Sequence, residues 1–280
     1  QEARYKKPIG IYWLQSASNL MFGAPPYDTI WPYRLPSLLG GILTLALLAA
    51  ALARLTDART GLIAALVLAS CAQLHFESRI GKTDAVLLAC ITGAQMLLAT
   101  AYRGPLSARQ AYGFWLLQAG AILIKGPIGP LVSLLTIAAL VFADRQAVWL
   151  KRLRPARGFM LCAVLVLPWL IIIGLTSGGK FYGEAVSHDL LGKIFEGQDR
   201  GWLPPGYHSL LLFAFFLPQI TLLLAALAAG WHVRRAPLPR FALAWLAPLW
   251  VVYELIATKL PHYVLPAYPA LALLAALLLT

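Results

Sequence analysis

Charge is scarce in this sequence: Asp, Glu, Lys and Arg make up only 12% of its 280 residues, about half of the ~25% found in soluble domains. Hydrophobic residues make up 60%, and the mean hydropathy is +0.73. So few polar side chains cannot coat a soluble globule, and several apolar runs approach the ~20 residues that cross a bilayer. The composition therefore predicts an all-α polytopic membrane protein. Because the runs are continuous rather than alternating, a transmembrane β-barrel is disfavoured.

Cysteine is also scarce. Cys71, Cys90 and Cys162 lie in or beside apolar runs and form no CxxC pair, so neither a zinc knuckle nor a disulfide framework is indicated. The formal net charge of +12 would suit a nucleic-acid binder, but the cations sit in short loops between apolar runs, as membrane topology requires. We therefore expect a membrane environment and no nucleic-acid partner.

Internal repeats and Gly/Ser-rich linkers are absent as well, so residues 1–280 are expected to form a single transmembrane domain. The sequence begins without Met, and its last residues, LALLAALLLT, stop inside an apolar run. We expect an internal piece of a longer chain, with an upstream first span, the first external loop and a C-terminal region missing.

Nine apolar stretches are candidate membrane spans, so about eight or nine spans are expected. They lie at roughly residues 35–53, 61–76, 85–101, 110–124, 128–143, 158–176, 208–230, 241–257 and 263–280. Residues 9–22 are also apolar, but a run of about 14 residues is more typical of an interfacial or re-entrant segment.

Alternation of these spans divides the loops into two sets. Of the 23 cations and 11 acids in the sequence, loops 54–60, 102–109, 144–157 and 231–240 contain 12 cations and 2 acids. The remaining segments contain 11 cations and 9 acids, mixed with His, Tyr and Trp. The positive-inside rule predicts that the first set is cytoplasmic and the second external. The longest external stretch, 177–207, predicts a short interfacial helix around residues 185–194.

Polar clusters on the external side need an explanation, because charge at membrane depth is costly. Lys125, in AILIKGPIGPLV, is either a snorkelling lysine at a helix end or a fixed cation at the mouth of a cavity. Asp84 directly precedes an apolar run, as helix caps do. However, Glu77, Arg79 and Lys82 share the same short stretch, and four charges in eight residues exceed what one cap needs.

Two further clusters are open to two interpretations each. Lys259, His262 and Tyr263, in ATKLPHYVLPAYP, form either an interfacial belt or a further cationic contact with the external cavity. His188, in the long external stretch, is either an ordinary surface residue or a contact to metal or substrate.

The N-terminal stretch RYKKPIGIYWLQ places Arg4, Tyr5 and Lys7 ahead of the short apolar segment, on the predicted external side. The positive-inside rule gives cations no reason to accumulate there. Cations from several loops around one cavity suit a phosphate or pyrophosphate, and the aromatic-rich neighbouring segments suit a lipid tail or a sugar. The residues therefore predict a lipid-phosphate substrate handled at the external side, without identifying a reaction.

An ordered set of motifs spans most of the chain: RYKKPIGIYWLQSASNLMFG, YRLPSLLGGILTLALLAALAR, SRIGKTDAVLLA, LIKGP and KLPHYVLPAYPALALL. In this order they resemble bacterial membrane glycosyltransferases of the GT-C type, in particular the aminoarabinose transferases that modify lipid A and the protein O-mannosyltransferase superfamily. The resemblance implies a GT-C-like transmembrane helical bundle in the bacterial inner membrane. It also implies transfer of a hexosyl or pentosyl group from a polyprenyl-phosphate donor to a lipid or protein acceptor at the periplasmic face.

The resemblance also implies roles for individual residues. Lys7 would approach the donor phosphate, with Arg4 and Tyr5 close by, and Asp84 would line the catalytic cavity as an acceptor-side or metal-side carboxylate. Further contacts with the donor phosphate are expected from Arg79, Lys125 and Lys259. Further contacts with the substrate cavity are expected from His188, His262 and Tyr263.

Two departures from the family pattern bear on the chemistry. The principal catalytic carboxylate of the family lies in the first external loop, upstream of residue 1. In the aminoarabinose transferases an acidic residue that helps to bind a metal precedes the lysine of the KP motif, where this sequence has Lys6. The sequence therefore predicts no definite cofactor and leaves a divalent metal open. It also leaves open which sugar is transferred and whether the acceptor is lipid A, a protein or another glycan.

Two other functions fit parts of the sequence. A transporter or flippase for lipid-linked or anionic substrates would share the apolar spans and the cationic cavity, but it should carry functional charges near the bilayer midplane, often with internal repeats. A structural membrane subunit would explain each polar cluster as a helix cap or an interfacial belt. It would not explain why all the clusters lie on the same predicted side of the membrane. The side-specific charges favour an enzyme.

Overall fold

The computed structural model describes residues 7–183, 203–217 and 219–280. Over these ranges the chain is built from helices without a strand, which confirms the predicted all-α fold class. The first helices are α1 (Gly10–Phe22), α2 (Trp31–Leu55), α3 (Ala58–Ala69), α4 (Ala72–Arg79), α5 (Asp84–Arg103), α6 (Ala108–Lys125) and α7 (Ile128–Asp144). They are followed by the 3-10 helix η1 (Val148–Leu153), α8 (Pro155–Thr176), α9 (Lys180–Gly183), α11 (Tyr207–Phe215), α12 (Ile220–His232), α13 (Pro237–Leu255), the 3-10 helix η3 (Pro261–Ala267) and α14 (Tyr268–Leu279). The interfacial helix expected around residues 185–194 lies outside the described residues.

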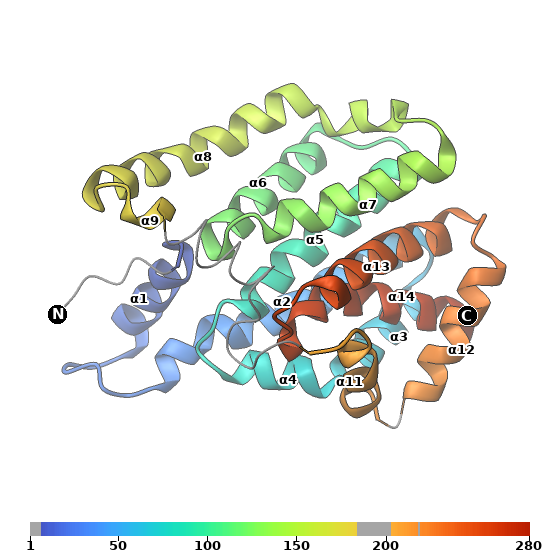
Figure 1. The fold of residues 1–280 in the computed structure, drawn as a ribbon, viewed down its shortest axis with the longest axis horizontal. Coiled ribbons are helices and arrows are strands. Elements are labelled where there is room, and N and C mark those ends of the chain that lie inside the picture. Colours follow the sequence, from blue (N-terminus) through green and yellow to red (C-terminus); the bar gives the residue numbers. More distant parts are fainter. Residues whose placement is uncertain (1–6, 184–202, 218) are drawn as a thin grey trace.

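The interior of the bundle is formed by α5 and α14 (Figure 1). α2 packs along α5 and α3, while α14 packs against α3, α12 and α13. In α5 and in the segment Pro261–Leu279, 72% of the residues of the apolar stretch are buried inside the protein. In α8 the buried share is 17%. A helix that is apolar all round and yet largely uncovered by protein is typical of a lipid-facing span. α8 therefore forms an edge of the bundle, as Figure 1 shows.

The contact between α2 and α5 depends on glycine. A Cβ added at Gly40 would lie 2.7 Å from the backbone nitrogen of Val86 and 2.8 Å from the carbonyl oxygen of Ala85. Small residues at transmembrane helix contacts let two backbones approach this closely. The close approach positions the first turn of α5, which begins at Asp84, against α2.

The number of membrane spans remains a prediction. Among the described residues, the segments that can cross a bilayer alone, by length and composition, are Trp31–Leu55, Asp84–Arg103, Pro155–Thr176 and Pro261–Leu279. α1 has 13 residues and is about 20 Å long at 1.5 Å per residue. That length is too short for a ~30 Å hydrocarbon core, as expected for an interfacial or re-entrant segment.

Two predicted spans are interrupted. The candidate span 61–76 contains a break, because α3 and α4 are bent by 71° relative to each other. Between them Cys71 has an extended backbone (φ −72°, ψ 117°). The predicted span 208–230 is likewise divided into α11 and α12. The sequence there has Pro218, and a proline cannot donate the backbone hydrogen bond of a continuing helix.

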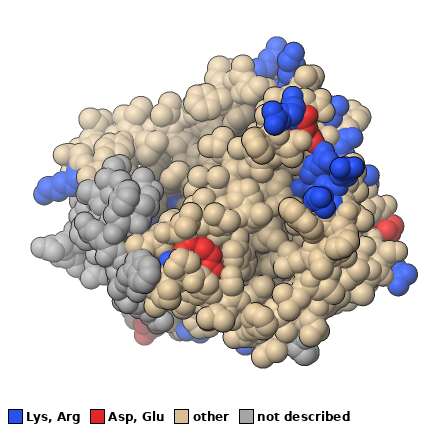
Figure 2. Space-filling model, turned by 45° about the vertical axis from the view of Figure 1, so that its right-hand side comes forward, with Lys and Arg blue, Asp and Glu red and all other residues tan. Residues whose placement is uncertain are grey.

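One end of the bundle gathers the loops predicted to be cytoplasmic. Tyr102 donates a hydrogen bond of 2.6 Å to Asp144, and Arg240 pairs with the same carboxylate. Arg103 donates to the carbonyl of Leu55. These bonds join loops 54–60, 102–109, 144–157 and 231–240 at one end, as the alternation of spans predicted. Figure 2 shows the largest group of Lys and Arg on the drawn face at one edge, beside a broad uncharged surface.

The opposite end is joined by different bonds. Ser37 of α2 donates to the carbonyl of Lys82 over 2.9 Å, and Gln15 of α1 donates to the carbonyl of Gly81 over 3.2 Å. α1 and the first turns of α2 are thereby held against residues 80–83, directly before α5. The segments predicted to be external therefore meet at this end.

Gly40→Ala is expected to destabilise the protein by about 1–3 kcal/mol, the usual cost of overpacking, because the added methyl group would meet the backbone of α5. Gly104→Ala is the matched control, since nothing lies within 4 Å of a Cβ at that position and its backbone is extended (φ −171°). Thermal unfolding in detergent measures both variants. Equal melting temperatures would contradict the packing argument.

Candidate active site

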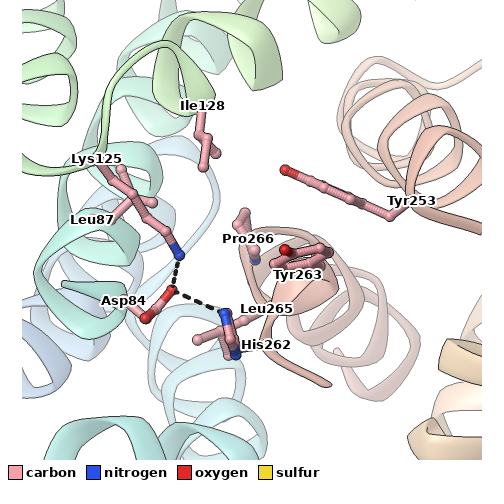
Figure 3. Close-up of a pocket in the computed structure, with 9 residues that line it drawn as sticks. All are labelled: Asp84, Leu87, Lys125, Ile128, Tyr253, His262, Tyr263, Leu265 and Pro266. Atoms are coloured by element: carbon pink, nitrogen blue, oxygen red, sulfur yellow. Dashed lines mark hydrogen bonds and ion pairs between the residues drawn. The ribbon is translucent and has the colours of Figure 1, made fainter. Parts of the chain in front are cut away.

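A small pocket lies where α5, α6, α7, α13 and η3 meet (Figure 3). Its lining residues are Asp84, Leu87, Lys125, Ile128, Tyr253, His262, Tyr263, Leu265 and Pro266. The pocket volume is about 10 Å³, close to the minimum for one water molecule. Within it Lys125 contacts Asp84 directly, and the same carboxylate oxygen lies 3.9 Å from His262.

Asp84 is the first residue of α5, but the helix start has no side-chain capping hydrogen bond. The carboxylate instead accepts a hydrogen bond of 2.5 Å from Nζ of Lys125 and lies 3.9 Å from Nε2 of His262. Its side chain is only 8% exposed. Of the two interpretations of Asp84, the geometry favours a carboxylate directed into a cavity over a helix cap.

Lys125 reaches Asp84 because α6 ends at this residue. Gly126 follows with φ +72°, a left-handed conformation that glycine adopts without strain, and Pro127 precedes the first residue of α7. The chain turns sharply and leaves the lysine at the mouth of the pocket, with 25% of its side chain exposed. The ammonium is engaged in an ion pair rather than reaching past a helix end into solvent.

His262, in η3, lies between two carboxylates. Its Nδ1 is 3.8 Å from Oε1 of Glu77, and its Nε2 is 3.9 Å from Oδ1 of Asp84. Both separations exceed a hydrogen bond, but each ring nitrogen faces an acidic oxygen. The ring also packs edge-on against Tyr263, with 5.2 Å between centroids. His262 therefore lies between the carboxylate of α4 and the carboxylate that begins α5.

Glu77 is a member of this group that the sequence analysis did not assign to the site. It is 1% exposed on the inner face of α4, where Gln73 donates to its Oε1 over 2.9 Å. Its Oε2 has no hydrogen-bond partner among the described residues, which is costly for a buried carboxylate. The signal was present in the sequence: Gln73, Leu74, Glu77 and Ser78 recur at helical spacing and form the buried face of α4.

Tyr253 is a second pocket residue that was not predicted from the sequence. It lies in α13 with a centroid distance of 5.5 Å to Tyr263, and its hydroxyl points into the pocket in Figure 3. Its position inside a long apolar run carried no signal that distinguished it from a packing residue.

The other described residues that were predicted for the site do not line this pocket. Lys7 is the first described residue and lies close enough for its charge to act on His262. Lys259 is 2% exposed, and its Nζ donates to the carbonyls of Leu203 and Ile256 at 2.8 Å each. Arg79 lines a second groove outside the pocket. The predicted contacts Arg4, Tyr5 and His188 lie outside the described residues.

A resident metal does not fit the described part of the pocket. Over 7–183, 203–217 and 219–280, no group of three or more His, Cys, Asp and Glu side chains is arranged to hold a metal ion. In addition, the oxygen of Asp84 that faces His262 is already occupied by the ammonium of Lys125. No step of the chemistry below is therefore assigned to a metal.

Relatives of known name cover nearly the whole chain. The undecaprenyl phosphate-alpha-4-amino-4-deoxy-L-arabinose arabinosyl transferase of Serratia proteamaculans is 25% identical over 280 residues, which cover 97% of this chain and 49% of that protein. The transferase of the same name from Pseudomonas aeruginosa is 29% identical over 282 residues, covering 96% and 49%. The chain thus spans about half the length of the curated relatives it matches.

Solved structures share the fold. ArnT from Cupriavidus metallidurans, crystallised with undecaprenyl phosphate bound, superposes with a TM-score of 0.86 over 98% of this chain and 50% of its own, at 22% identity. The archaeal oligosaccharyltransferase AglB from Archaeoglobus fulgidus, in complex with an inhibitory peptide and a dolichol-phosphate, superposes with a TM-score of 0.67 over 99% and 42%, at 16% identity. These similarities confirm the predicted GT-C-like membrane helical bundle.

A family model supplies the assignment. The model described as Dolichyl-phosphate-mannose-protein mannosyltransferase matches residues 6–172, more than half of the chain and most of the motifs that carried the resemblance. The chain therefore belongs to the dolichyl-phosphate-mannose-protein mannosyltransferase family.

Proposed function

We propose that the protein containing this chain is a glycosyltransferase that moves a sugar from a polyprenyl-phosphate donor to a lipid or protein acceptor. The observation that carries the proposal is the pocket in which Asp84, Lys125 and His262 meet, at the end of the bundle opposite the arginine-rich loops. Family membership and the undecaprenyl phosphate-sugar named for the relatives support the same chemistry.

The proposal places the pocket at the periplasmic face of the bacterial inner membrane. The arginine-rich loops meet at the other end of the bundle, and the positive-inside rule assigns such loops to the cytoplasm. A substrate carried on a polyprenyl chain would then reach the pocket from the outer leaflet of that membrane.

The chemistry is a displacement with inversion at the anomeric carbon. The acceptor oxygen bonds to this carbon while the bond from carbon to the phosphate oxygen breaks, and the lipid phosphate leaves with the electron pair. The acceptor proton passes to a carboxylate that acts as general base. Fixed cations stabilise the charge that develops on the leaving phosphate.

Residue roles combine the family resemblance with the positions and charges of the described residues. Lys7, with Arg4 and Tyr5, is assigned to the donor phosphate, and Asp84 to the acceptor side. Lys125 was expected at the donor phosphate and is assigned here to holding the carboxylate of Asp84 in place. His188, His262 and Tyr263 are assigned to the substrate cavity. Arg79 and Lys259 are less suited to the donor phosphate, because Arg79 faces a separate groove and the ammonium of Lys259 is engaged by two carbonyls.

The transporter alternative receives less support. It predicts functional charges near the bilayer midplane on broken helices. In the described residues the charges of the pocket lie at helix ends instead: Asp84 begins α5 and Lys125 ends α6. This arrangement suits chemistry at one membrane surface better than passage through the membrane.

Lys7→Ala in the full-length protein is expected to lower turnover by about two orders of magnitude, because a fixed cation at the leaving phosphate is removed. The assay measures lipid phosphate released from polyprenyl-phosphate sugars in membranes. Lys180→Ala, at an exposed lysine of α9, is the matched control and should transfer normally at equal protein level. Wild-type rates in both Lys7→Ala and Asp84→Ala would reject the site assignment.

Lys125→Met is expected to destabilise the protein by about 3 kcal/mol, since it leaves the carboxylate of Asp84 without the ammonium that pairs with it. Combining it with Asp84→Leu should recover most of that loss, because an apolar pair can replace a buried ion pair. The double variant should nevertheless remain inactive. Thermal unfolding and the transfer assay separate the two effects, and wild-type transfer by the double variant would show that the pair is only structural.

A further inference from the structure

The helix α4 has two chemically different faces. Its buried residues are Gln73, Leu74, Glu77 and Ser78. Its exposed residues are Ala72, His75, Phe76 and Arg79, spaced i, i+3, i+4 and i+7, so they form one stripe. The helix that holds Glu77 beside His262 therefore presents Arg79 in another direction, away from the pocket.

The exposed stripe lines one wall of a groove of about 510 Å³. The lining residues are Arg34, Ala72, His75, Phe76, Arg79 and Ile80. Arg34 comes from the first turn of α2, so two guanidinium groups from distant parts of the sequence share the groove. The groove shares no lining residue with the candidate active site.

Neither arginine is neutralised by a carboxylate of the described residues. The acids that form ion pairs there are Glu77, Asp84, Asp144 and Glu254, and their partners are other side chains. Two guanidinium groups in one groove repel each other unless an anion lies between them. Phosphate is the anion best matched to them, because the guanidinium fork binds its oxygens in pairs.

The groove lies beside the starts of two helices that are long and apolar enough to span a membrane. Arg79 is five residues ahead of Asp84, where a spanning helix begins, and Arg34 lies near the start of the spanning helix α2. Apolar side chains are exposed in and beside the groove: Phe76 is 58% exposed, and Trp31, one turn before Arg34, is 52% exposed. An aromatic residue at this level is typical of the headgroup region of a bilayer. An occupant of the groove therefore needs both a phosphate and apolar chains.

We propose that this groove binds the phosphate of an anionic phospholipid headgroup in the leaflet at the external end. The two arginines and His75 face the phosphate, while Phe76 and Ile80 contact the upper part of the acyl chains. The proposal is independent of sugar transfer, because lipid retention is measurable without turnover and involves no residue of the active-site pocket.

The test is lipid retention by the full-length protein in mild detergent, measured by native mass spectrometry with palmitoyl-oleoyl phosphatidylglycerol or phosphatidylcholine. The wild-type protein should retain phosphatidylglycerol in preference to phosphatidylcholine. Arg34→Gln combined with Arg79→Gln should weaken retention of phosphatidylglycerol by about tenfold or more, as expected when two basic residues near an anionic lipid are removed.

Matched variants make the outcome decisive. Arg34→Lys with Arg79→Lys keeps the charge without the fork and should give intermediate retention, while Lys180→Gln removes another exposed cation of the predicted external side and should change nothing. Both arginines are exposed, so melting temperatures should stay equal. Unchanged retention in the double Gln variant, or an equal loss in Lys180→Gln, overturns the proposal. Displacement of the lipid by millimolar inorganic phosphate also overturns it, because the groove would then be a site for free phosphate.

Discussion

A lysine and a carboxylate at the end of a membrane bundle stabilise the fold only when they meet, because each charge alone carries a large desolvation cost. Lys125 and Asp84 meet at 2.5 Å although they are separated by 41 positions in the sequence. The lysine is the last residue of α6 and the aspartate is the first of α5. The pair therefore fixes how the two helices end relative to each other, and with it the position of the pocket.

The other contacts at this end are arranged around that pair. The close approach at Gly40 sets α2 against the start of α5, and the bond from Ser37 to the carbonyl of Lys82 holds the segment before Asp84. His262 then lies within 4 Å of both Asp84 and Glu77. A proton or a charge placed on any one of these three side chains changes the electrostatic potential at the other two, because burial reduces solvent screening.

The sequence predicted those features that depend only on the order of residues along the chain. Apolar run length predicted the helical bundle, and the contrast between arginine-rich and mixed loops predicted that Asp84, Lys125, His262 and Tyr263 share one end. It was uninformative where a contact depends on side-chain direction. Lys259 has the composition of a phosphate ligand, but its stem runs inward and its ammonium binds two carbonyls. The break near Cys71 lies between alanine and serine neighbours, without the Pro or Gly that marks a helix end in sequence. Residues 61–76 were therefore expected as one candidate span.

That break has consequences for both sites of the external end. If α3 continued straight through residues 61–76, the residues of α4 would follow the direction of a membrane span, and Glu77 would be carried away from His262. The 71° bend instead lays α4 across the end of the bundle, so that one face reaches the pocket and the opposite face lies beside Arg34. A short helix in this orientation has an exposed face on one side and a buried face beside His262 on the other. The eight residues of α4 therefore lie between the proposed lipid site at Arg79 and the buried carboxylate of Glu77 beside His262.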